Sequence, residues 1–120
     1  SIPTIATTPD AVIVGSGLAG MAAALNILDR GGTVIMVEKE HLLGGNSNKA
    51  SSGINAWSGQ NDTYNDSLES FRNDTIQSAG AVAELGLIDT LVSKSNQAVM
   101  WLKERANVDL SLLAQLGGHS

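Results

Sequence analysis

Cysteine is absent from this chain. Its absence excludes disulfides, cysteine-ligated iron–sulfur clusters, c-type haem attachment and thiol-linked flavin. Any redox chemistry must therefore use a non-covalently held organic cofactor. The two histidines, His41 and His119, lie far apart in the sequence and have no carboxylate cluster at ligand spacing, so the sequence predicts no metal site.

Basic residues are few and scattered. Seven Lys and Arg residues stand against 12 Asp and Glu, which gives a net charge of −5 and no electrostatic footprint for nucleic acid or an anionic membrane. No apolar run approaches the ~20 residues that a membrane span needs. The length of 120 residues, with 42% hydrophobic and 16% charged residues, predicts a soluble, globular chain of one domain at most. We therefore exclude nucleic acid and a membrane span.

A glycine-rich turn follows the first apolar run. The run Ala11–Val14 has the length of a buried parallel strand, and the turn after it reads Gly15-Ser16-Gly17-Leu18-Ala19-Gly20. In such a GxGxxG motif the first glycine permits the tight turn, the second lets the backbone approach a pyrophosphate, and the third lets the helix pack closely. The following helix would point unpaired N–H groups and its positive dipole end at the phosphates. The motif predicts strand, turn and helix around a dinucleotide.

An acidic residue ends the next apolar run. Glu38 stands 18 positions beyond Gly20, directly after Thr33–Val37, close to the roughly 20-residue spacing of the acid that accepts hydrogen bonds from an adenosine ribose. A carboxylate there repels a 2′-phosphate, which disfavours NADP. The alternative is a βαβ unit that binds no dinucleotide, but it requires the glycines and the acid to coincide for packing reasons alone.

The pattern predicts strands over residues 11–15 and 33–38 and a helix over 18–30. Residues 43–62 are rich in Gly, Ser and Asn, and so long a loop predicts a ligand-binding segment. A capping-box pattern with Asp66 as N-cap predicts a helix to Ala79. A third helix is predicted from Val82 or Leu87 to Arg105, with its apolar face formed by Leu87, Leu91, Ala98, Val99 and Leu102.

Two longer runs carry a family resemblance. Glu38 is followed, after five residues, by Gly44-Gly45, a pair that glutathione-reductase-type FAD-binding chains show and NAD-binding chains lack. The runs GGNSNKASSGINA (44–56) and LLAQLGGHS (112–120) resemble the succinate dehydrogenase and fumarate reductase flavoproteins, most closely the soluble fungal and trypanosomatid fumarate reductases. The resemblance spans residues 10–120 and leaves 1–9 as a leading linker. It implies an α/β, Rossmann-like FAD-binding domain.

The resemblance also implies a FAD site. Ala19 and Glu38 would contact the ADP half, and residues of the run after Gly44 would follow the pyrophosphate and isoalloxazine with their backbone N–H groups. In membrane-bound members a histidine at the place of Asn46 carries the flavin covalently, so the FAD here is expected to be non-covalent. An ordinary polar turn is the alternative for Ser51–Gly53. The implied cofactor-binding residues are Gly15, Ser16, Gly17, Ala19, Gly20, Glu38, Lys39, Gly44, Gly45, Asn46, Ser47, Ser51, Ser52 and Gly53.

The activity that the resemblance implies is hydride transfer from reduced FAD to fumarate, which gives succinate. The family's proton-donating arginine and substrate histidines lie in segments beyond Ser120, so no catalytic residue is expected here and fumarate or succinate would bind outside these residues. No haem or iron–sulfur motif is present, so electrons would come from a free carrier such as NADH or reduced flavin, or from a further domain. The expected compartment is the cytoplasm or the mitochondrion.

The family's flavin domain is completed by a later return of the chain, after a capping domain. Neither is present in these 120 residues, which are therefore expected to be the N-terminal portion only, inactive alone, with an apolar sheet face uncovered. Two alternatives stay open: a truncated or stand-alone nucleotide-binding module without catalysis, and a related flavoprotein dehydrogenase with another substrate.

Overall fold

A computed structural model describes residues 8–57, 59 and 66–114 of the chain. Contacts divide the chain into two compact units, residues 1–53 and 54–120. Residues 58 and 60–62 of the predicted binding loop, and the QLGGHS end of the family run at 112–120, lie outside the described residues.

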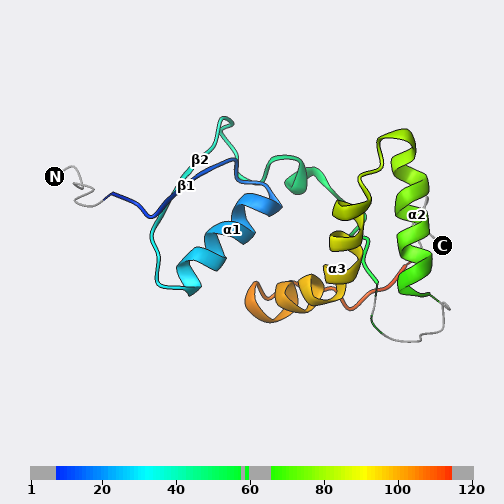
Figure 1. Ribbon diagram of the computed structural model, residues 1–120. Helices are drawn as coiled ribbons and strands as arrows, with labels where there is room; N and C mark the ends of the chain where they lie inside the picture. Colours follow the sequence, from blue (N-terminus) through cyan, green and yellow to red (C-terminus); the bar gives the residue numbers. More distant parts are fainter. Residues whose placement is uncertain (1–7, 58, 60–65, 115–120) are drawn as a thin grey trace. The chain divides into compact units, whose positions relative to one another are not determined.

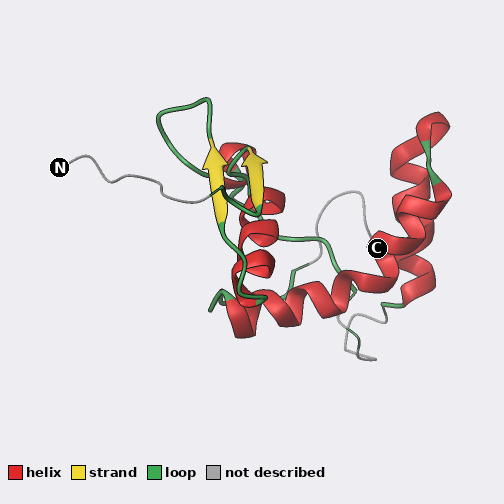
Figure 2. Ribbon diagram, turned by 60° about the vertical axis from the view of Figure 1, so that its left-hand side comes forward, coloured by secondary structure: helices red, strands yellow, loops and turns green. Residues whose placement is uncertain are grey.

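The first unit is a strand–helix–strand arrangement. Strand β1 (Ala11–Val14) pairs in parallel with β2 (Val34–Val37), with Ala11 opposite Val34 and Val14 opposite Val37. Helix α1 (Leu18–Asp29) joins the strands and runs alongside them (Figure 1), and both strand arrows point the same way in Figure 2. The predicted strands and helix are confirmed to within a residue at each end, and the α/β class is confirmed.

The turn between β1 and α1 requires glycine at two positions. Gly15 has a φ of +99°, which L side chains rarely adopt, and its N–H donates to the Val37 carbonyl at 2.8 Å. A Cβ atom on Gly20 would lie 2.0 Å from the Gly15 carbonyl oxygen. The first turn of α1 can therefore lie against the end of β1 only because residue 20 has no side chain.

Helix α1 leaves one face of the strand pair uncovered. Side chains alternate between the faces of a strand, and Ile13 faces α1, where its Cγ2 would be 3.3 Å from a Cβ on Gly20. Val12 and Val14 point to the other face, and Val14 is 84% exposed. The first unit therefore presents an open, apolar sheet face, as the sequence predicted.

The close approach at Gly20 gives a test of the fold. We expect Gly20→Ala to lower the free energy of unfolding by about 3 kcal/mol, because the new methyl group would overlap the Gly15 carbonyl. Gly86→Ala, in helix α3 (Leu85–Arg105), is the matched control: a Cβ there meets open space, so stability should change by no more than ~1 kcal/mol, in the stabilising direction. Urea denaturation measures both, and equal stabilities of the two variants would contradict the packing described.

The second unit is built on two helices. Helix α2 (Leu68–Ala79) and helix α3 (Leu85–Arg105), joined through the short 3₁₀ turn η2 (Gly80–Val82), enclose a small core of Phe71, Ile88 and Val92. The N-cap of α2 is Ser67, which corrects the prediction of Asp66. Ser67 has an extended backbone and its hydroxyl accepts the Ser70 N–H at 3.0 Å, while Asp66 accepts the N–H of Ser67 itself.

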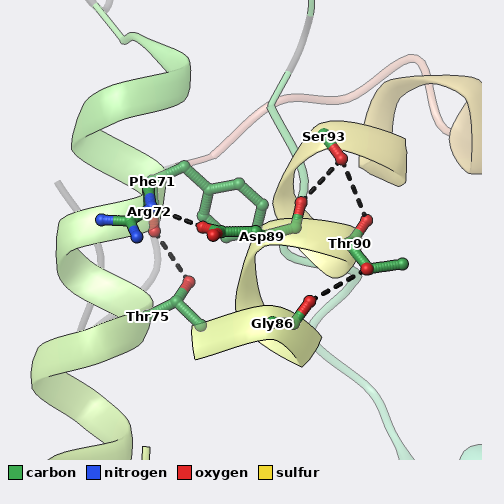
Figure 3. Close-up of polar contacts among 7 residues, drawn as sticks. All are labelled: Phe71, Arg72, Thr75, Gly86, Asp89, Thr90 and Ser93. Atoms are coloured by element: carbon green, nitrogen blue, oxygen red, sulfur yellow. Dashed lines mark hydrogen bonds and ion pairs between the residues drawn. The ribbon is translucent and has the colours of Figure 1, made fainter. Parts of the chain in front are cut away.

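The buried face of α3 differs from the prediction at Leu87, Leu91 and Ala98, which are exposed, whereas the predicted Val99 and Leu102 are half-buried. Ile88, Val92 and Ser95 are buried, whereas Leu87 is 72% and Leu91 is 56% exposed. Two apolar stripes lie side by side on this helix, and packing against Phe71 of α2 selects the stripe that contains Ile88 and Val92. The choice is reinforced by an ion pair between Arg72 Nε and Asp89 Oδ1 at 2.5 Å (Figure 3).

Hydroxyl side chains bond back to carbonyl groups along α3. Thr90 Oγ1 donates to the Gly86 carbonyl at 2.9 Å and Ser93 Oγ to the Asp89 carbonyl at 2.6 Å (Figure 3). Such bonds often bend helices, and α3 is visibly bent along its length (Figure 1). In the described part of the chain, no helix is long and apolar enough to cross a membrane.

Candidate functional site

The carboxylate of Glu38 meets the glycine turn at the end of the strand pair. Its Oε2 accepts hydrogen bonds from the Ser16 backbone N–H, at 3.0 Å, and from the Ser16 hydroxyl. Its Oε1 accepts from the N–H of Glu40 at 3.0 Å. The C-terminal ends of parallel strands lie at one edge of a sheet, so residues directly after β1 and β2 come together there. The turn and the acid, predicted separately, form one site.

These hydrogen bonds hold Glu38 in its charged form. The hydroxyl of Ser16, followed by the backbone N–H groups of Glu40 and Ser16, lowers the pKa of Glu38 from 4.5 to about 2. Hydrogen bonds donated to a carboxylate favour its ionised state. Oε2 already accepts two hydrogen bonds, so a further donor, such as a hydroxyl of a ligand, finds its free lone pair on Oε1.

Ser16 connects a third segment to this contact. Its side chain is only 1% exposed, and its Oγ accepts the N–H of Gly44 at 2.9 Å. The hydroxyl thus lies between the end of β2 and Gly44, which directly precedes the 3₁₀ turn η1 (Gly45–Lys49). One buried side chain joins the glycine turn, the acid and the second glycine-containing segment.

The N-terminus of α1 already has one acceptor. Ser47 Oγ, on η1, accepts the Leu18 N–H at 3.0 Å, which corrects the expectation of unpaired N–H groups at this one position. The N–H groups of Ala19 and Gly20 have no acceptor among the described residues. The first turn of α1 contains no acidic residue of its own, and its positive dipole end favours an anion.

The structure gathers most of the predicted site residues at this edge of the sheet. Gly45 lies beside Gly17, since a Cβ on Gly45 would be 3.8 Å from the Gly17 Cα. Lys39 is exposed, with its Nζ 3.9 Å from Glu40 Oε1. The remaining predicted residues are exposed, and within the described ranges none of them hydrogen-bonds to the glycine turn: Asn46, Ser51, Ser52 and Gly53.

Two contacts of the first unit, one at this site and one at the other end of the strand pair, were missed from the sequence. The hydroxyl of Ser16 was expected only as part of the turn, although it is the one polar side chain in a turn of glycines and apolar residues. Asp10 was not expected at all: its Oδ2 accepts the Thr33 N–H at 2.8 Å and the Thr33 hydroxyl at 3.1 Å. Asp10 closes the opposite end of the strand pair and thereby supports the register.

The groups gathered at this edge of the sheet are suited to binding a ligand. They offer an ionised acceptor, backbone N–H donors and a helix N-terminus, which suit a ligand that carries both hydroxyl groups and phosphate. Across residues 8–57, 59 and 66–114 there is no group of three or more His, Asp or Glu side chains that could hold a metal ion. The site therefore has the properties of a dinucleotide-binding edge.

Comparison with known proteins identifies the family. Residues 10–120 match the family described as FAD binding domain, and the chain belongs to it, which confirms the predicted resemblance. The chain is 45% identical over 118 residues to a fumarate reductase of Schizosaccharomyces pombe and 42% identical over 113 residues to fumarate reductase 1 of Saccharomyces cerevisiae. It is 37% identical over 116 residues to a fumarate reductase (cytochrome) of Shewanella frigidimarina.

These relatives are much longer than the chain. The alignments cover 96%, 91% and 94% of this chain but only 23%, 24% and 20% of the respective relatives. The chain thus spans less than a quarter of the length of each of these three proteins.

The lowered pKa of Glu38 predicts a pH dependence of stability. A folded-state pKa of about 2, below the ordinary 4.5, means that the stabilisation is fully present above the ordinary pKa and is lost as the pH falls towards 2. Glu38→Gln cannot titrate. We therefore expect wild type to lose stability relative to Glu38→Gln between about pH 5 and pH 2, measured by urea unfolding at each pH. A stability difference that stays constant over this range would contradict the prediction.

The contact between Ser47 and α1 predicts a local loss of stability. Ser47→Ala removes the acceptor of the Leu18 N–H, and loss of a helix cap costs about 1 kcal/mol. Ser51→Ala, which alters an exposed side chain in the same segment, is the matched control and should leave the unfolding midpoint unchanged. Amide exchange at Leu18 adds a local readout, and equal exchange rates in both variants would show that Ser47 does not cap α1.

Proposed function

We propose that residues 10–120 form the N-terminal part of a Rossmann-like FAD-binding domain of the glutathione-reductase type, after a linker of residues 1–9. The observation that carries the proposal is the ionised Glu38 held against the glycine turn, beside the N-terminus of α1. The chain belongs to the FAD binding domain family, and these residues lie where an adenine dinucleotide would place its ribose and pyrophosphate.

Each part of the proposed site has a binding role. Glu38 Oε1 would accept from a ribose hydroxyl, and the free N–H groups of Ala19 and Gly20 would face the pyrophosphate. The exposed segment from Asn46 to Gly53 would follow the rest of the cofactor through its backbone. An asparagine side chain does not form a histidine-type covalent link to flavin, so Asn46 favours a dissociable FAD.

We propose that the whole protein reduces fumarate to succinate. All three relatives described above are named fumarate reductases, and bound FAD would supply the hydride chemistry. Residues of this chain would hold and orient the cofactor, whereas fumarate would bind through parts of the protein beyond residue 120. The electron donor would be a free carrier such as NADH or reduced flavin, or a further domain of the whole protein, and the compartment the cytoplasm or the mitochondrion.

The test uses the full gene product that contains this chain. After incubation with FAD and gel filtration, we expect a flavin absorbance band that acid precipitation releases into the supernatant, and oxidation of a reduced dye on addition of fumarate. Glu38→Gln should weaken FAD binding by about tenfold, the loss of one hydrogen bond to a charged group. Glu104→Gln, which makes the same change at an exposed acid on α3, outside the glycine turn, is the control and should bind FAD like wild type.

The outcomes separate the parts of the proposal. Absence of retained flavin would overturn the FAD assignment, and flavin that stays with the acid pellet would overturn non-covalent binding. If the protein retains flavin but fumarate does not oxidise the dye, the fumarate assignment is overturned. The protein would then be a binding module without catalysis, or a flavoprotein that acts on a different substrate. The 120-residue chain, tested in parallel, should not reduce fumarate.

A further inference from the structure

One buried hydroxyl connects the three segments of the proposed site. Ser16 Oγ donates its only proton to Glu38 Oε2 and accepts the N–H of Gly44 at 2.9 Å. Ser16 is 22 positions from Glu38 in the chain and 28 positions from Gly44, so both hydrogen bonds are tertiary contacts. At 1% exposure, the hydroxyl cannot exchange either partner for bulk water without a change in the surrounding structure.

We propose that Ser16 is a positioning residue, whose hydroxyl fixes the rotamer of Glu38 and holds the Gly44 segment beside it. The contact of Glu38 with the adenosine and the position of the Gly44 segment then depend on the same side chain. The inference rests on the proposed function, since it concerns the same dinucleotide site. It adds a role for a side chain that the glycine motif itself leaves unspecified.

The geometry of Glu38 supports this role. A free glutamate has several rotamers, but here Oε2 is held by two donors of Ser16 and Oε1 by the N–H of Glu40. Oε2 is thereby filled, and the remaining lone pair is presented on Oε1. A ligand hydroxyl then meets an acceptor that is already oriented, and less conformational freedom is lost on binding.

The link to Gly44 extends the effect to the second segment. Gly44 N–H, the Ser16 hydroxyl and Glu38 form a chain of hydrogen bonds in which each donor polarises the next. Gly44 directly precedes η1, and η1 carries Ser47, the residue that contacts the N-terminus of α1. Removal of the Ser16 hydroxyl would therefore loosen the acid and the loop together, although neither is altered in sequence.

A double-mutant cycle in the full gene product tests the inference. The variants are Ser16→Ala, Glu38→Gln and the combination, with Ser93→Ala on α3 as a matched control whose hydroxyl bonds only within its own helix. We expect FAD binding to weaken about tenfold in each single variant and by a similar factor, not a hundredfold, in the double variant, because both changes remove the same oriented acceptor. Additive losses, or a Ser16→Ala variant that binds FAD like Ser93→Ala, would overturn the inference while the proposed function stands.

A second readout does not require the cofactor. In ligand-free protein, Ser16→Ala should accelerate amide exchange at Gly44 by about tenfold, the loss of one hydrogen bond, and leave exchange in α3 unchanged. If Ser16→Ala does not fold, Ser16→Cys keeps the shape of the side chain, with a somewhat larger sulfur atom, and replaces the hydroxyl with a weak donor, and the same two readouts apply. Unchanged Gly44 exchange would overturn the inference. Wild-type protein that binds no FAD would instead overturn the proposed function, and the dinucleotide role of Ser16 with it.

Discussion

The parallel pairing of β1 and β2 places the residues that follow the two strands at a single sheet edge, and the contact between Ser16 and Glu38 depends on that pairing. The register sets Val14 opposite Val37, so the turn after one strand and the acid after the other are neighbours. Gly44 reaches the same point through the Ser16 hydroxyl, and Ser47 reaches α1 from the segment that follows. A shift of register by one residue would separate Ser16 from Glu38 and undo the other contacts.

The sequence predicted the elements of the first unit well because their signals are local. Apolar runs of strand length, the glycine turn and the spacing to Glu38 are readable without knowledge of the fold. The contacts of Ser16 with Gly44 and of Ser47 with Leu18 were not readable, because they join residues 28 and 29 positions apart. In α3 the prediction failed for another reason: two adjacent stripes are both apolar, and only Phe71 of α2 decides which one is buried.

The electrostatics of the site separate binding from proton transfer. A carboxyl group with a pKa of about 2 is ionised at neutral pH and is a poor proton donor there, since a general acid works best with a pKa near the working pH. Glu38 is therefore suited to accept hydrogen bonds from a ligand. The neighbouring groups are backbone amides and hydroxyls, which hold a ligand in place. Proton transfer to a substrate would need a different group.

The contact of Ser47 with the N-terminus of α1 reduces the free energy that a phosphate gains by binding at this helix end. In the ligand-free chain the Leu18 amide already has a hydroxyl acceptor. A phosphate oxygen at that amide would exchange one acceptor for another, so the gain is the difference between a charged and a neutral hydrogen bond. The same hydroxyl keeps the helix end satisfied when no ligand is present, so the empty and filled states of the turn can share one backbone conformation.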